Sequence, residues 1–357
     1  MDSYDRVMIS LNHKNPDRPP LDFAATDEVI NKLLKHLNFS NYNSLLEFLG
    51  VDLWHFAPRY IGPKQFTETN FMGVDNIKKD YFGILWKPVK TKYAKYYEIE
   101  SHPLINIKDV DDIEKYPWPK TDWFDAYYIK EEIKKIGGSG KKAIVLYAGG
   151  AFEIAWYMRS MEQLFYDLMY NPQIAEAIFK KLAEFFKNRT MQAIEILKGK
   201  VDIVYSDGDI GTQNGMMISP VIWRKYIKPW SEELIKPFKK MGFKTMYHSC
   251  GSIVPVIDDF IEMGLDILDP VQTSAKDMNP EYLKEHFGER ISFHGGVDEQ
   301  RLLPYSKDSE VESEVSGLID VLGKNGGYIL SSSHAIQPDT PLENILAMYR
   351  AAKNYKY

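Results

Sequence analysis

Short apolar runs recur along the chain with the lengths and boundaries of buried strands. They are four to eight residues long and cover residues 21–24, 51–57, 143–147, 201–206, 243–250, 267–271, 291–294 and 328–331. Runs of this length that end at glycine or polar residues favour strands over helices. The pattern therefore predicts eight strands.

Longer stretches with apolar residues at helical spacing lie between these runs. They cover residues 27–37, 44–49, 126–136, 154–169, 174–197, 221–241, 253–263, 280–287 and 311–322, and residues 3–12 form a short leading helix. Strands that alternate with helices predict a parallel sheet, and right-handed crossovers would close eight such units into an α/β fold, the (β/α)8 TIM barrel. Residues 62–104 break the rhythm with short alternating pieces, which indicates an inserted hairpin region.

An open, doubly wound sheet is the alternative architecture. No Gly-x-Gly-x-x-Gly follows the first strand, which weighs against the dinucleotide-binding form of that fold. No shift of composition marks a domain boundary, so we expect a single barrel domain over residues 1–357.

Composition and charge exclude some classes of binding partner and cellular compartment. The 44 lysines and arginines against 50 acidic residues give a net charge of −6 without a basic block, which argues against nucleic acid. No apolar run is long enough to cross a membrane, and the N-terminal residues lack the apolar core of a signal peptide. A single cysteine agrees with a reducing cytoplasm, and we expect a cytoplasmic protein with no membrane partner.

The strand at residues 243–250 ends in the chain's clearest candidate for metal binding. His248 and Cys250 stand two residues apart, so both side chains point to one side of an extended backbone. An imidazole together with a thiolate is a soft donor pair suited to zinc. A buried free cysteine beside a structural histidine is the alternative.

Catalytic groups of a barrel come from the carboxyl ends of several strands. Polar residues at these ends are Glu153, Asp207, Asp209, Gln213, Asp269, Gln272, His294, Asp298, residues 331–333 and His334. Barrel closure can bring His334 across the mouth to His248 and Cys250, giving three ligands and one open position, as in catalytic zinc sites. A substrate-binding or capping role for His334 is the alternative. The remaining histidines, at 13, 36, 55, 102 and 286, are interpreted as structural or surface residues away from the mouth.

Two segments give the chain a family resemblance. Residues 247–272, YHSCGSIVPVIDDFIEMGLDILDPVQ, and residues 326–348, GGYILSSSHAIQPDTPLENILAM, resemble the uroporphyrinogen decarboxylase superfamily. FHGGVD at residues 293–298 and the Trp118-Pro119 loop fit as well. Within the superfamily, the His-x-Cys-Gly segment is similar to the zinc segment of corrinoid-linked methyltransferases, such as methylcobalamin:coenzyme M methyltransferase.

The resemblance implies a zinc-dependent methyltransferase. Such an enzyme moves a methyl group between a small methylated substrate (an ether, amine or thiol) and a corrinoid carried by a partner protein, and the direction is open. Two differences matter. His334 stands where coenzyme M methyltransferases usually have cysteine, and the decarboxylases' Arg-Gln-Ala-Gly-Arg motif is absent after Arg18-Pro19-Pro20. A substrate with many carboxylates needs cationic partners, so tetrapyrrole decarboxylation is the alternative. A non-catalytic corrinoid- or ligand-binding barrel is a third.

The expected roles divide into three groups. Zinc would be held by His248, Cys250 and His334, and two neutral histidines with one thiolate would leave it a formal charge of about +1. Candidate catalytic residues are Glu153, Asp207 and His334, and candidate substrate-binding residues are Asp209, Gln213, Gln272, His294 and Asp298. Glu153 would donate a proton or complete the metal site, although a carboxylate at a helix N-terminus also stabilises the helix dipole. Asp207, Asp209 and Gln213 would orient the metal-bound histidine or hold the substrate, and Asp298 would do so or stabilise its own loop.

Overall fold

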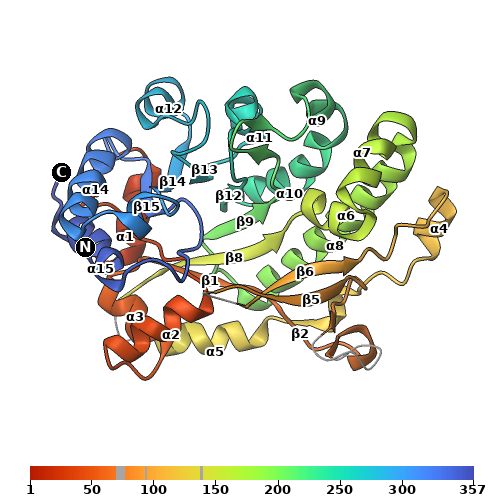
Figure 1. Ribbon diagram of the computed structural model, residues 1–357, viewed down its shortest axis with the longest axis horizontal. Coiled ribbons are helices and arrows are strands. Elements are labelled where there is room, and N and C mark those ends of the chain that lie inside the picture. The colour runs from red at the N-terminus through yellow and green to blue at the C-terminus, as the bar shows by residue number, and fades with distance from the viewer. Residues whose placement is uncertain (70–76, 93–94, 137–139) are drawn as a thin grey trace.

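The computed structural model describes residues 1–69, 77–92, 95–136 and 140–357. Its main sheet has seven parallel strands in the order β1-β8-β9-β12-β13-β14-β15, and these curl around a common axis (Figure 1). Their bounds are β1 Leu53–Phe56, β8 Ala143–Gly149, β9 Ile203–Asp207, β12 Lys244–His248, β13 Ile267–Val271, β14 Ser292–Val297 and β15 Tyr328–Ser332. Each lies within or closely overlaps a predicted strand, and the predicted barrel-type fold is confirmed.

The ring is closed by residues 20–22, the last two of which belong to the strand predicted over residues 21–24. The Leu330 N–H donates to Pro20 O at 2.9 Å, and the Asp22 N–H donates to Leu330 O at 2.9 Å. On the other side the Asp52 N–H donates to Leu21 O at 2.8 Å. The predicted strand 21–24 is therefore only a pair of isolated bridges, at Leu21 and Ala25. Proline before Leu21 lacks a backbone N–H, which shortens the ladder here.

Buried charges hold this closure in place. The Asp52 carboxylate is fully buried and accepts hydrogen bonds from Arg6 and Arg18, each at 2.7 Å. It also accepts the Leu21 N–H at 2.9 Å. Arg18 is thus committed to a structural ion pair outside the barrel mouth.

The helices of the barrel follow the predicted alternation, but two predicted helices are divided and the helices at residues 110–115, 302–305 and 342–354 were not predicted. Their bounds are α1 Ser3–Leu11, α2 Asp27–His36, α3 Tyr42–Leu49, α4 Val110–Lys115, α5 Tyr127–Ile136, α6 Ala151–Arg159, α7 Met161–Tyr170, α8 Pro172–Leu197, α9 Pro220–Tyr226, α10 Lys228–Lys240, α11 Ile257–Met263, α12 Pro280–Phe287, α13 Leu302–Tyr305, α14 Asp308–Leu322 and α15 Leu342–Asn354. The predicted helix 154–169 is divided between α6 and α7 at Ser160, whose φ of 68° ends one helix while its hydroxyl caps the next. The predicted helix 221–241 is divided at Ile227, and Pro229, the second residue of α10, lies in the first turn of the new helix. Among the described residues no helix is both long and apolar enough to cross a membrane.

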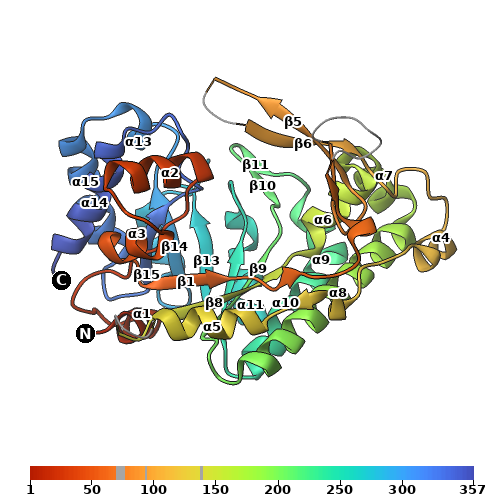
Figure 2. The ribbon, with the colours of Figure 1, turned by 90° about the horizontal axis from the view of Figure 1, so that it is seen from below.

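The inserted region is a separate antiparallel sheet of β3 Glu68–Thr69, β4 Lys78–Lys79, β5 Leu85–Lys90 and β6 Lys95–Ser101. Residues 70–76 and 93–94 of the predicted hairpin region lie outside the described residues. Figure 2 shows the β5–β6 hairpin as an arm that extends beyond the barrel strands. The Tyr96 hydroxyl donates to Gln337 Oε1 at 2.9 Å, so the arm touches the segment that follows β15. Short pairs β2 Arg59–Tyr60 with β7 Phe124–Asp125, and β10 Gly211–Thr212 with β11 Gly215–Met216, complete the strands.

Candidate metal centre and adjoining cavity

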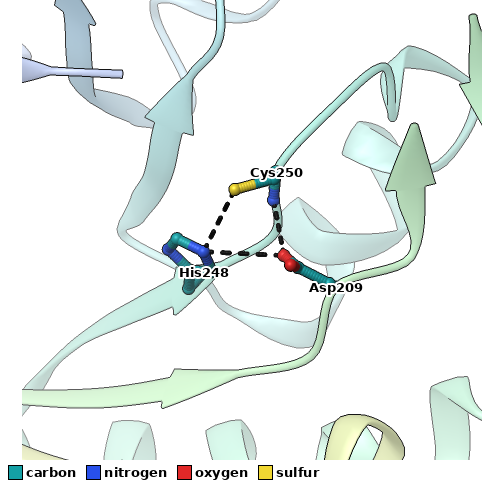
Figure 3. A group of neighbouring side chains, drawn as sticks. All are labelled: Asp209, His248 and Cys250. Atoms are coloured by element: carbon teal, nitrogen blue, oxygen red, sulfur yellow. Dashed lines mark hydrogen bonds and ion pairs between the residues drawn. The ribbon is translucent and has the colours of Figure 1, made fainter. Parts of the chain in front are cut away.

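Three side chains meet at the carboxyl ends of β9 and β12. The ligand atoms of Asp209, His248 and Cys250 lie within 4.8 Å of one another (Figure 3). His248 Nε2 is 3.4 Å from Cys250 Sγ and 3.5 Å from Asp209 Oδ1. The predicted pair of His248 and Cys250 is thus brought together, and Asp209, expected to bind substrate, is the third member.

Local structure fixes this arrangement. Strand β12 ends at His248, and the Gly251 φ of 81° turns the chain back after Cys250. The Cys250 N–H donates to Asp209 Oδ1 at 2.8 Å, which ties the two strand ends together. A methyl group on Gly211 would lie 2.4 Å from Cys250 O, so only glycine allows the loops to approach this closely.

The cluster fits a zinc ion in distance and charge. In a tetrahedral site with Zn–S of about 2.3 Å and Zn–N or Zn–O of about 2.0–2.1 Å, neighbouring donors lie roughly 3.4–3.6 Å apart. The distances from His248 Nε2 to Cys250 Sγ and to Asp209 Oδ1, 3.4 Å and 3.5 Å, agree with this geometry. Burial raises the pKa of the Cys250 thiol, its contact with His248 lowers it, and the nearby Asp209 carboxylate raises it further. A cation among these donors would relieve that repulsion.

The second nitrogen of His248 is held by a carboxylate, as metal-bound imidazoles usually are. His248 Nδ1 lies 2.7 Å from Asp269 Oδ2, which also accepts the Tyr205 hydroxyl at 2.6 Å. This partner places the proton on Nδ1 and leaves the Nε2 lone pair for a metal. Burial opposes the charge on His248, but its contacts with Asp269 and Cys250 raise its pKa well above the ordinary value.

Asp269 begins a row of alternating carboxylates and imidazoles. His294 Nδ1 lies 2.5 Å from Asp269 Oδ1, and His294 Nε2 lies 3.0 Å from Asp22 Oδ2. Asp22 Oδ2 also contacts His55 Nε2 at 2.7 Å. Because both nitrogens of His294 face carboxylates, the ring is an imidazolium: burial opposes its charge, yet Asp269 and Asp22 raise its pKa to about 9. Likewise burial opposes ionisation of Asp22, but His55 and His294 lower its pKa well below the ordinary value.

Several of these residues were missed by sequence reasoning. Asp22 and His55 had no predicted role, and His55 was wrongly interpreted as lying away from the mouth. Asp269 was identified only as a polar strand end, whereas it is the carboxylate that orients His248, a role predicted for Asp207, Asp209 or Gln213. The signal was weak, since His55 lies in the second half of the predicted strand 51–57 and Asp22 lies near the start of the predicted strand 21–24.

The other predicted residues are distributed around this centre. Asp207 is half-buried and accepts the Tyr147 hydroxyl. Gln272 Oε1 accepts the Gly251 N–H at 2.8 Å and supports the turn after Cys250. Gln213 donates to Gln300 Oε1 at 3.1 Å on the surface. Asp298 Oδ1 accepts the backbone N–H groups of Gln300 and Arg301. Asp298 therefore stabilises its own loop, the alternative to a substrate-binding role.

Glu153 and His334 retain functional potential. Burial raises the pKa of Glu153 to about 7; the hydrogen bond from Tyr157 opposes this rise, and the carboxylates of Asp207 and Asp209 add to it. A carboxyl with such a pKa can hold or release a proton near neutrality. His334 is exposed and lines a groove together with Cys250 and Gln272. Within the described part of the chain it is not a member of the Asp209–His248–Cys250 cluster.

A cavity of about 440 Å³ adjoins the cluster. Its polar wall contains every carboxylate and imidazole of the row, together with residues 331–334. Its apolar wall includes Phe23, Tyr42, Leu46, Trp54 and Phe56. The described residues that line it include no lysine or arginine. The volume is that of a small-molecule site.

Comparison with known proteins identifies relatives along the whole chain. A family model described as Uroporphyrinogen decarboxylase (URO-D) matches residues 88–355. A uroporphyrinogen decarboxylase of Geobacter sulfurreducens is 23% identical over 265 residues, which cover 69% of this chain and 70% of the relative. That of Protochlamydia amoebophila is 21% identical over 370 residues, with 98% of this chain and 91% of the relative covered. A solved methyltransferase from Methanosarcina mazei has a TM-score of 0.70 at 17% identity, covering 99% of this chain and 98% of that one, and it shares the fold.

Proposed function

Because the chain belongs to the uroporphyrinogen decarboxylase family, we propose that it is a member that transfers methyl groups with the help of zinc. The methyl group would move between a small methylated substrate and a corrinoid on a partner protein. The observation that carries this proposal is the cluster of Asp209, His248 and Cys250, with Asp269 behind His248. The fold shared with the Methanosarcina methyltransferase is consistent with it.

The residues of the cluster have distinct parts in this function. Cys250, His248 and Asp209 would hold zinc, which when bound supplies Lewis acidity to a substrate or thiol heteroatom. Asp269 keeps the His248 proton on Nδ1. Glu153 holds a proton on its carboxyl group below about pH 7 and can supply it to a leaving heteroatom.

The ligand set affects the charge of the centre. With His248, Cys250 and His334 as ligands, the formal charge is about +1. Asp209 in place of His334 adds a second anionic donor and reduces that charge to about zero. His334 remains a predicted ligand.

Tetrapyrrole decarboxylation, the activity named for the curated relatives, is the competing function. The cavity lining opposes it, since no lysine or arginine among the described lining residues is present to pair with carboxylates. Arg18, the arginine nearest the family's arginine-rich segment, is already bound to Asp52 at 2.7 Å.

Metal analysis of the purified protein tests the proposal. We expect about one zinc per chain in the wild type. Cys250→Ala and Asp209→Ala should lose it, whereas a control on an exposed helical histidine, His36→Ala, should keep it. Loss in His334→Ala would make that histidine a ligand, and retention would assign it to substrate.

Activity assays then separate the two reactions. Methyl transfer from methylated ethers, amines or thiols to reduced cobalamin should require Cys250. Zinc-free wild type, or decarboxylation of uroporphyrinogen that survives in Cys250→Ala, would refute the proposed function.

A further inference from the structure

His55 is the most exposed imidazole of the row. Its side chain is 35% exposed, against 22% for His248 and 6% for His294. It extends from β1, and it lines the same cavity as His248. The Tyr205 ring lies edge-on to both imidazoles, with centroid distances of 6.0 Å to His55 and 6.4 Å to His248. The Tyr205 ring therefore lies next to both His55 and the metal-binding His248.

Asp22 fixes the orientation of His55. Its Oδ2 lies 2.7 Å from His55 Nε2, while its Oδ1 accepts the Phe23 N–H at 2.8 Å. Only 4% of Asp22 is exposed, so it is a rigid partner rather than a ligand group. A ring that donates from Nε2 has a lone pair on Nδ1. Among the described residues Nδ1 has no hydrogen-bond partner, so it is the atom that a molecule in the cavity can reach.

The charges of the cavity select against anions. Asp22 and Asp269 contribute two negative charges, and the His294 imidazolium offsets one of them. The third carboxylate of the lining, Glu132, is paired with Lys135 at 2.6 Å. Zinc with the Cys250 thiolate and the Asp209 carboxylate would add no net charge. The lining residues supply no lysine or arginine, so an anionic substrate would lose its hydration without a compensating cation.

The charges do not call for a cation either. Both buried carboxylates already accept several hydrogen bonds, so they offer little to a further positive group. The facing wall is aromatic, with Tyr42, Trp54 and Phe56. Such a wall fits a flat or apolar body with a single polar group.

We propose that this cavity takes a small, uncharged, largely apolar molecule that carries one hydroxyl or N–H group apart from its methylated heteroatom. This group donates a hydrogen bond to His55 Nδ1, and the Asp22–His55 pair sets this specificity. The inference rests on the proposed function in treating this molecule as the methylated substrate. It makes His55 a substrate-binding residue and Asp22 its positioning residue.

Four probes with a common ring test the proposal by NMR titration of the zinc-loaded protein at pH 7: phenol, toluene, benzenesulfonate and phenyltrimethylammonium. Phenol should bind about tenfold tighter than toluene, the effect of one satisfied hydrogen bond. Both should bind tighter than the two ions. In His55→Gln the amide can replace Nε2 toward Asp22 but leaves nothing at Nδ1, so the preference for phenol over toluene should vanish.

His55→Asn is the second variant, because its amide lies near the former Nδ1 position. It should retain part of the preference. His36→Gln, on the surface of α2, is the matched control and should behave as wild type. An unchanged phenol-to-toluene ratio in a folded His55→Gln would reduce His55 to a structural role, and tighter binding of either ion would overturn the substrate class. Binding of these probes requires neither methyl transfer nor a corrinoid. The binding test can therefore fail while the methyltransferase assay succeeds, and it can succeed while that assay fails.

Discussion

Replacing Asp269 with asparagine should weaken zinc binding without touching a zinc ligand. The carboxylate accepts from His248 Nδ1 at 2.7 Å, from Tyr205 at 2.6 Å and contacts His294 Nδ1 at 2.5 Å. Asparagine has one acceptor oxygen, and its amide nitrogen would oppose the N–H of one of the two rings. If that ring is His248, its proton moves to Nε2 and the metal loses its lone pair.

The magnitude follows from known outer-sphere effects. Loss of the carboxylate behind a metal-bound histidine lowers affinity about 10–100-fold, or roughly 1.4–2.7 kcal/mol. The buried His294 imidazolium also loses one of its two counter-charges, so the free energy of unfolding should fall by about 3–5 kcal/mol. Asp258→Asn, on the exposed side of α11, is the matched control.

Competition with a chromophoric chelator measures the zinc affinity of each variant, and circular dichroism first establishes that it is folded. An affinity of folded Asp269→Asn within threefold of the wild type would refute the argument that Asp269 sets the His248 tautomer.

Three further predictions concern stability. Asp52→Ala, which leaves two arginines without their buried partner, should lower the free energy of unfolding by about 3–5 kcal/mol in urea titrations; a loss under 1 kcal/mol would contradict its role in barrel closure. Burial raises the pKa of Glu153 to about 7, so wild type should lose stability relative to Glu153→Gln as the pH rises from about 4.5 to 7, by at most about 3 kcal/mol. Parallel profiles of unfolding free energy against pH for the two proteins would refute the raised pKa. Gly150→Ala should destabilise by more than about 2 kcal/mol, since its methyl group would lie 1.9 Å from Asp207 O, and a melting temperature equal to wild type would show that the loop can yield.

Periodicity predicted the barrel well because each unit buries its own apolar pattern. Strand β13 was predicted at its observed bounds, residues 267–271, and β12 ends within two residues of its predicted end. The closing segment at residues 20–22 was harder. It pairs through only a few hydrogen bonds beside two prolines, so its apolar run looked like a longer strand than the backbone can form.

The site was predictable only where its residues are neighbours in sequence. His248 and Cys250 share one strand end, so their proximity follows from local geometry. Asp22 comes from the closing segment, and His55 and His294 come from two other parts of the chain, β1 and β14. Which side chains meet across a barrel depends on tilt and rotamer rather than on a local pattern. Asp209 in turn reaches the cluster through a loop that only the glycine at position 211 permits.

The closing segment has a consequence for local opening of the barrel. Residues 20–22 join their neighbours through three main-chain hydrogen bonds, so this seam should open at a lower free energy than the interior strands. Asp22 lies in the seam, and opening would carry its carboxylate away from both His55 and His294. By linkage, a molecule that engages His55 must slow amide exchange at Asp22 and Leu330. Binding in the cavity and closure of the strand ring are then coupled, so each stabilises the other.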